Sequence, residues 1–191
     1  QRQMCIRDRG DGALELRIGF SFVSEKNARE NLEAEMLGKS FAEVRSEATA
    51  TWNDLLGRIR VEGGTEREKG LFYSSLYRSF LWPALRSDVN GEFTDVDGKV
   101  INPGFRYYTG PSYWDDYRNK LILLGMLAPD VAADVISSDT DKGEKRGGFM
   151  PTFFHGDHAS AFVAGTYLRG NRGFDVNRAY NLVLRNATVQ G

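Results

Sequence analysis

The feature that most constrains the fold is a single stretch of alternating apolar and polar residues near the start of the chain. It reads ALELRIGFSFV, from Ala13 to Val23, with an apolar residue at every second position of its first half. Such alternation is typical of a strand with one buried face. A lone strand is unstable because its backbone groups need partners, so we predict the last strand of a truncated β domain whose sheet lies upstream.

The first ten residues, QRQMCIRDRG, show neither helical nor strand periodicity. They resemble the translated adapter sequence found in some environmental assemblies, and we interpret residues 1–10 as a non-native leader and leave them out of the predicted fold. A disordered natural N-terminus is the alternative. The single cysteine, Cys5, excludes an internal disulfide.

Composition argues against two classes of partner. The formal net charge of the chain is -1, so it lacks the basic surplus that binding to a phosphate backbone requires. Its longest apolar run, Leu121 to Leu127, is far shorter than the roughly 18 residues that span a bilayer. We therefore expect neither a nucleic-acid nor a membrane partner.

Beyond the strand, the chain is patterned mainly for helices. Thr65 and Glu68 form a capping-box sequence after the Gly63-Gly64 break, and a helix with an apolar stripe follows. Ser24 is predicted to cap a helix that runs to Met36. The other predicted helices are Phe41–Arg58, Tyr113–Met126, Pro129–Ser138, Ala159–Leu168 and Val176–Ala187, the last two capped by Asp157 and Asp175.

Two segments interrupt the helices. The turn dipeptides Asn90-Gly91 and Asp97-Gly98 predict an inserted β-hairpin, and the polar run SDTDKGEKRGG is predicted to be a loop. The Asp88–Gly91 and Asp95–Gly98 sequences are faintly similar to calcium loops, but they lack the further oxygen ligands of an EF-hand. We interpret both as turns.

The densest group of functional residue types is SYWDDYR, from Ser112 to Arg118. An indole face covers the apolar face of a sugar ring, and a carboxylate accepts hydrogen bonds from neighbouring hydroxyls. Trp114 and Asp115 are therefore candidate sugar-binding residues. The alternative is a capped helix in which Trp114 and Tyr117 pack inward.

The second candidate is His155-Gly156-Asp157-His158, which contains both histidines of the chain. These residue types suit the polar rim of a ligand pocket. A zinc site is less favoured because a fourth ligand and the usual helical histidine spacing are missing. The remaining alternative makes Asp157 a helix cap with the histidines merely nearby.

The order of several motifs resembles glycoside hydrolase family 92. These motifs include IGFSFVSEKNARENLEAE, SDVNGEF, SYWDDYR, GGFMP and GDHASAFVAGTYLRGNRGFDV, and the similarity runs from Leu14 to Gly191. The family consists of calcium-dependent, inverting exo-α-mannosidases with an N-terminal β-sandwich and an (α/α)6 toroid.

The resemblance implies a mainly α chain that contains the start of this toroid, preceded by the last strand of the sandwich and carrying the hairpin insertion. Residues 11–24 would end the sandwich, residues 25–64 would form a helical linker, and residues 65–191 would be the first, incomplete part of the catalytic domain.

The resemblance also implies roles for individual residues. Trp114 and Asp115 would bind the terminal mannose, and Asp157 and His158 would form part of the pocket wall. The family's Glu-Gly-Asn acid motif and its paired-Asp loop do not occur in this sequence. We therefore expect the catalytic acid, the base and the calcium ligands downstream of this chain, and we expect the fragment itself to be inactive and poorly folded.

The implied partners are mannose-containing glycans, and the family habit implies a periplasmic or extracellular location. Two other functions stay open from the sequence. One is a different glycosidase on the same helical toroid, and the other is a non-catalytic carbohydrate-binding module that keeps Trp114 and Asp115.

Overall fold

The computed structural model describes residues 2–8, 12, 14–152, 154 and 156–189. The chain divides into two compact units. One consists of Gln1–Thr51 together with Arg86–Gly104, and the other of Trp52–Leu85 together with Phe105–Gly191. Each unit is described by itself.

The first unit begins with an antiparallel hairpin of β1 (Arg2–Asp8) and β2 (Leu14–Phe20), in which Arg2 pairs with Phe20 and Asp8 with Leu14. The strand predicted around β2 is confirmed, although its first residue, Ala13, lies outside the described residues. Residues 2–8, which the sequence analysis left out of the fold, form β1 and supply a partner for β2 within this chain.

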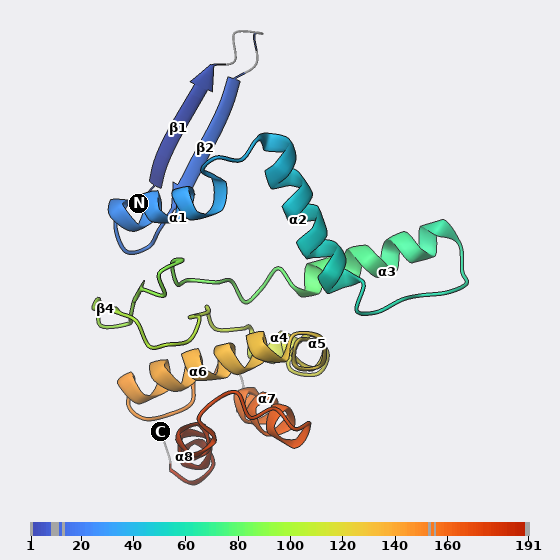
Figure 1. Cartoon of the computed structure of the whole chain (residues 1–191). Helices are drawn as coiled ribbons and strands as arrows, with labels where there is room; N and C mark the ends of the chain where they lie inside the picture. The colour runs from blue at the N-terminus through green and yellow to red at the C-terminus, as the bar shows by residue number, and fades with distance from the viewer. Residues whose placement is uncertain (1, 9–11, 13, 153, 155, 190–191) are drawn as a thin grey trace. The chain divides into compact units, whose positions relative to one another are not determined.

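The face of β2 that packs is not the apolar face. Helix α1 (Glu25–Met36) lies against β2 (Figure 1), and a Cβ on Gly19 would sit 2.1 Å from the carbonyl oxygen of Ala28. Arg17, on the same face as Gly19, donates to the carbonyl oxygens of Met36 and Lys39 at 2.7 and 2.6 Å. These bonds join Arg17 of β2 to the last residue of α1 and to the segment that follows it.

The apolar face of β2 stays open in the part of the chain that the structure describes. Leu14, Leu16 and Phe20 are 70%, 49% and 62% exposed. The sequence therefore predicted the strand correctly. The expectation that its apolar side chains form a buried face is wrong for Leu14, Leu16 and Phe20.

The predicted hairpin insertion is present as β3 (Phe93–Thr94) and β4 (Val100–Ile101), which pair antiparallel. The two aspartate-rich segments are turns, as predicted. The backbone N–H of Gly91 donates to the Asp88 carbonyl at 2.9 Å, and that of Gly98 donates to the Asp95 carbonyl at 3.1 Å. These backbone bonds close the two turns.

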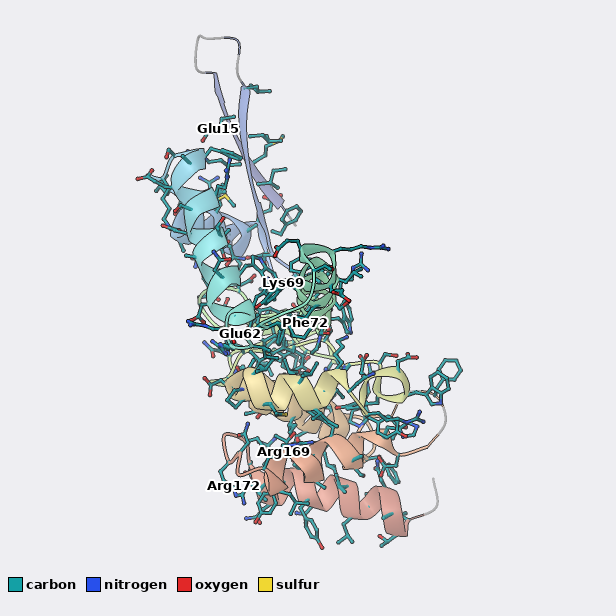
Figure 2. All side chains as sticks on the ribbon, turned by 90° about the vertical axis from the view of Figure 1, so that its right-hand side faces the viewer. Glu15, Glu62, Lys69, Phe72, Arg169 and Arg172 are labelled. Carbon is teal, nitrogen blue, oxygen red and sulfur yellow. The ribbon has the colours of Figure 1, made fainter. Side chains whose placement is uncertain are left out.

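Two helices connect these elements to the rest. Helix α2 (Phe41–Leu56) runs across the division between the units and has no buried residue. Helix α3 (Glu66–Ser79) begins with the predicted capping box of Thr65 and Glu68. Figure 2 shows its side chains, with Lys69 and Phe72 labelled. Only Leu76 of α3 is buried, and Leu71 is 58% exposed, so the predicted apolar stripe is covered in part.

The second unit has a helical core. Its remaining helices are α4 (Tyr113–Asp116), α5 (Lys120–Leu127), α6 (Pro129–Lys145), α7 (His158–Leu168) and α8 (Val176–Thr188). Helix α6 packs against α5 and α8, and α7 packs against α4, α5 and α8 (Figure 1). Asp157 and Asp175 cap α7 and α8, as predicted.

Two predicted boundaries in this unit are wrong. The single helix expected over Tyr113–Met126 is broken, because the side chain of Asn119 accepts from the backbone N–H of Lys120 and starts a new helix there. The expected loop SDTDKGEKRGG is helical as far as Lys145. Although the segment is polar in sequence, it continues the buried face of α6, on which Asp139 and Gly143 follow Ala132 and Ile136.

Among the described residues, no single helix is long and apolar enough to cross a membrane. Helices α5 and α6 would satisfy the length and composition requirement only as a pair, and that pair is bent by 120°.

Candidate functional site

The fold brings the two candidate motifs together, because α4 carries Trp114 and Asp115 and packs against α7, which begins at His158. The ring of Tyr117 stacks on the ring of His158, with centroids 4.2 Å apart and planes 12° apart. The ring of Trp114 lies 6.3 Å from that of Phe154. Motifs about 40 residues apart in the sequence thus lie side by side within the second unit.

Trp114 is half exposed, at 50%. The alternative in which Trp114 packs inward is therefore wrong, and the buried aromatic of this turn is its neighbour Tyr113, at 2% exposure. Tyr117 is half-buried on His158. A one-residue difference in helical phase thus presents the Trp114 indole to solvent while Tyr113 enters the core.

Asp115 is exposed beside Trp114. Its Oδ2 accepts a hydrogen bond from the Ser112 hydroxyl at 2.6 Å, which fixes the orientation of the carboxylate. No hydrogen bond reaches its Oδ1 from the part of the chain that the structure describes. An oriented carboxylate with one open oxygen beside an exposed indole is the arrangement that sugar recognition uses.

Asp157 is engaged in local structure. Its Oδ1 accepts from the backbone N–H of Ser160 at 3.3 Å and from Asn186 Nδ2 at 3.2 Å, and its Oδ2 accepts from the Ser160 hydroxyl. The capping interpretation is confirmed. Contact of Asp157 or His158 with a sugar stays a prediction, and the first histidine of the motif, His155, lies outside the described residues.

A buried polar cluster, which the sequence analysis did not predict, joins α4 to α6. The Tyr113 hydroxyl donates to Asp139 Oδ2, and Lys142 Nζ donates to Asp139 Oδ1 at 2.7 Å. Burial raises the pKa of the Asp139 carboxyl, against the opposing effects of Lys142 and Tyr113. Burial, and then the nearby Asp139 charge, hold the pKa of Tyr113 well above its ordinary value, so the phenol stays protonated and can donate.

The signal for this cluster was present in the sequence. Asp139 continues the 3.6-residue period of Ala132 and Ile136, but a polar residue in phase with an apolar stripe is easily taken for the end of a helix. Lys142, three residues on, provides the charge partner. Because this segment was expected to be a loop, neither Asp139 nor Lys142 was predicted to belong to a buried cluster.

No group of three or more His, Cys, Asp and Glu side chains within the described residues is arranged to hold a metal ion. Divalent calcium takes six to eight oxygen ligands. Calcium binding stays a prediction about the longer protein.

Residues 27–191 match the model of the glycosyl hydrolase family 92 catalytic domain. The chain belongs to glycosyl hydrolase family 92. Among curated proteins, the chain is 33% identical over 94 residues to an uncharacterised secreted glycosidase of Arthroderma benhamiae, a match that covers 47% of this chain and 12% of that protein.

Solved structures of family 92 are similar to the chain over nearly its whole length. A family 92 α-mannosidase of Bacteroides thetaiotaomicron is 28% identical, with a TM-score of 0.82 over 93% of this chain and 25% of its own. An inverting mannosidase of the family, from the same organism, is 26% identical, with a TM-score of 0.84 over 96% of this chain and 26% of its own.

The mainly helical class with small antiparallel sheets agrees with these family members. A further structure of the first of them is a complex with mannoimidazole, with a TM-score of 0.80 over 93% of this chain. The chain spans about a quarter of the length of these family 92 structures.

Proposed function

We propose that this chain is part of an inverting exo-α-mannosidase that removes terminal α-mannose from glycans. The observation that carries the proposal is the likeness, over 93% and 96% of this chain, to an α-mannosidase and an inverting mannosidase of family 92. The pairing of an exposed indole with an oriented carboxylate at Trp114 and Asp115 supports the same substrate class.

In this proposal the residues of the chain bind and orient the sugar. Trp114 covers the apolar face of the terminal mannose, and Asp115 Oδ1 accepts from its hydroxyls. The stack of Tyr117 on His158 holds the neighbouring wall. Asp157 fixes the start of α7 through Ser160 and Asn186, and so presents His158 to that wall.

Inversion needs a carboxylic acid for the leaving oxygen and a carboxylate base for water, about 6.5–9.5 Å apart. We assign these two groups and the calcium ligands to parts of the longer protein beyond this chain. Calcium would orient the sugar and strengthen the polarisation of the attacked bond when bound. Export from the cytoplasm is part of the same proposal, supported by the secreted relative.

The test is mannose release by the complete protein from α-linked mannobiosides, with the anomer of the released sugar read by proton NMR. We expect β-mannose as the first product, loss of turnover with a chelator and its return with calcium. The 191-residue chain, assayed in parallel, should release no mannose.

Each alternative predicts a different result. A complete, folded protein that binds mannose without releasing it would indicate a carbohydrate-binding module. Release of another sugar would indicate a different glycosidase. Turnover by the 191-residue chain alone would contradict the placement of the acid and base outside it.

A further inference from the structure

A buried polar cluster includes Tyr113, the residue that directly precedes Trp114 and Asp115. Asp139 is fully buried, Tyr113 is 2% exposed, and the two are joined by a hydrogen bond from the Tyr113 hydroxyl. Lys142 completes the cluster by donating to Asp139 and, at 2.9 Å, to the carbonyl oxygen of Tyr108. The cluster therefore ties α4, α6 and the segment before α4 together.

Helix α4 needs such an external anchor. It has only four residues, and Ser112 at its N-cap position makes no side-chain hydrogen bond to the backbone. An isolated helical turn is unstable in water because nucleation is costly. Tyr113 is the one buried residue of α4, so its contacts decide how the turn is held.

The polar nature of the anchor is informative. Taking a carboxylate out of water is costly even when it is paired, and well-packed apolar residues often stabilise a fold equally well. A hydrogen bond to a buried carboxylate, however, fixes one orientation, whereas an apolar contact tolerates sliding. The cluster thus suits a role in precise placement better than a role in stability alone.

Tyr113 is also held from the side of α7, because its ring lies 6.2 Å from that of Phe162. The Tyr113 side chain therefore contacts both α6 and α7, and its own backbone leads directly into Trp114 and Asp115.

We infer that Asp139, acting through the Tyr113 hydroxyl, is a positioning residue that sets the orientation of Trp114 and Asp115 toward the terminal sugar. The inference rests on the proposed function for the identity of the ligand. It adds a residue of α6 that affects sugar binding, although Trp114 and Asp115 themselves lie on α4.

The chain offers a matched pair of variants. Tyr113→Phe removes the hydroxyl that bonds Asp139. Tyr107→Phe removes the hydroxyl of a second buried tyrosine, which bonds Asp141, also on α6, at 3.5 Å. Both variants keep the ring and lose a hydroxyl that donates to a carboxylate of α6, but only Tyr113 directly precedes Trp114.

In the complete protein, we expect Tyr113→Phe to raise KM for an α-mannobioside and to weaken mannoimidazole inhibition by about five- to tenfold, with kcat within about twofold. One hydrogen bond to a charged group is enough for a change of that size. Tyr107→Phe should leave both constants within about twofold. Equal effects of the two variants, or none from Tyr113→Phe, would overturn the inference.

A second measurement does not depend on mannosidase activity. Amide hydrogen exchange over residues 113–117 should be about tenfold faster in Tyr113→Phe and unchanged in Tyr107→Phe, with α8 protected equally in both. Unchanged exchange over 113–117 would overturn the positioning role. If Tyr113→Phe exchanges faster over 113–117 than the wild type, but the complete wild-type protein releases no mannose, then the positioning role is retained and the proposed function is refuted.

Discussion

Adjacent residues of α4 have opposite environments, and this contrast gives a direct test of Trp114. Trp114 is half exposed while Tyr113 is buried. Replacing an exposed side chain away from packed features changes stability by about 0.5 kcal/mol or less. We expect Trp114→Ala to leave the urea midpoint of unfolding nearly unchanged and to abolish measurable mannose affinity of the complete protein.

The matched control for Trp114→Ala is Tyr180→Ala, which removes another exposed aromatic, at 58% exposure on α8. It should change neither the midpoint nor the affinity. If Trp114→Ala lowers the midpoint strongly while mannose affinity survives, then the indole serves packing and the assigned sugar contact is wrong.

At the residue scale, the sequence predicted the exposed part of the site but not its support. The aromatic and acidic residues of SYWDDYR pointed to Trp114 and Asp115, because these residue types suggest sugar binding without any knowledge of how the helices pack. The Tyr113–Asp139 bond joins residues 26 positions apart, and the stack of Tyr117 on His158 is equally non-local. Neither follows from periodicity, because both depend on how helices pack.

Among the elements, α3 has an N-terminus whose stability should depend on pH. Glu68 Oε2 accepts from the backbone N–H of Thr65 at 2.7 Å and from the Thr65 hydroxyl at 2.9 Å. These two bonds, the backbone bond first, lower the pKa of Glu68 from its ordinary 4.5. A lowered folded-state pKa means that the bonds stabilise α3 above pH 4.5, and that this stabilisation is lost as the pH falls through the folded-state value.

We therefore expect Glu68→Gln to lower the melting temperature at pH 6 and to converge with the wild type near pH 3. Glu66→Gln, in the same first turn and 90% exposed at its side chain, should show no such convergence. Melting curves by circular dichroism between pH 3 and pH 6 measure both. Parallel pH profiles for Glu68→Gln and the wild type would contradict the assignment.

Helix starts were predicted better than helix ends. Caps such as Ser24, Thr65 and Asp175 are chemically specific, and the structure confirms each of them. A second box, in which Glu43 accepts from the backbone N–H of Ser40 at 2.7 Å, was missed. The end of α6 was misplaced because Asp139 and Lys142 neutralise each other within the fold, which makes polar residues compatible with a buried helical face.

At the scale of the whole molecule, the first unit is held by a polar network between distant segments. Asp88 is buried and accepts from the Ser21 hydroxyl and from Asn31 Nδ2, each at 2.7 Å. Asn27 Nδ2 donates to Glu92 at 2.9 Å. Removing a buried acceptor leaves its donors unsatisfied, at about 1–3 kcal/mol.

We expect Asp88→Ala to accelerate amide exchange in α1 by about tenfold or more while α6 and α8 keep their protection. Asp97→Ala, at an exposed position of the neighbouring turn, is the control and should leave α1 unchanged. Hydrogen exchange followed by mass spectrometry resolves both units in one experiment. Equal acceleration in α1 and α8 would show that the two units do not unfold separately.

The discontinuity of the first unit has a consequence for the order of events during synthesis. Ser21, Asn27 and Asn31 emerge from the ribosome early, but their partners Asp88 and Glu92 are made 57 to 67 residues later, after the segment Trp52–Leu85 of the other unit. The polar network of the first unit can therefore close only after Asp88 and Glu92 have left the ribosome. A translational pause that keeps these two residues inside the exit tunnel would lengthen the interval in which a chaperone can bind α1, and a pause after both have emerged would not.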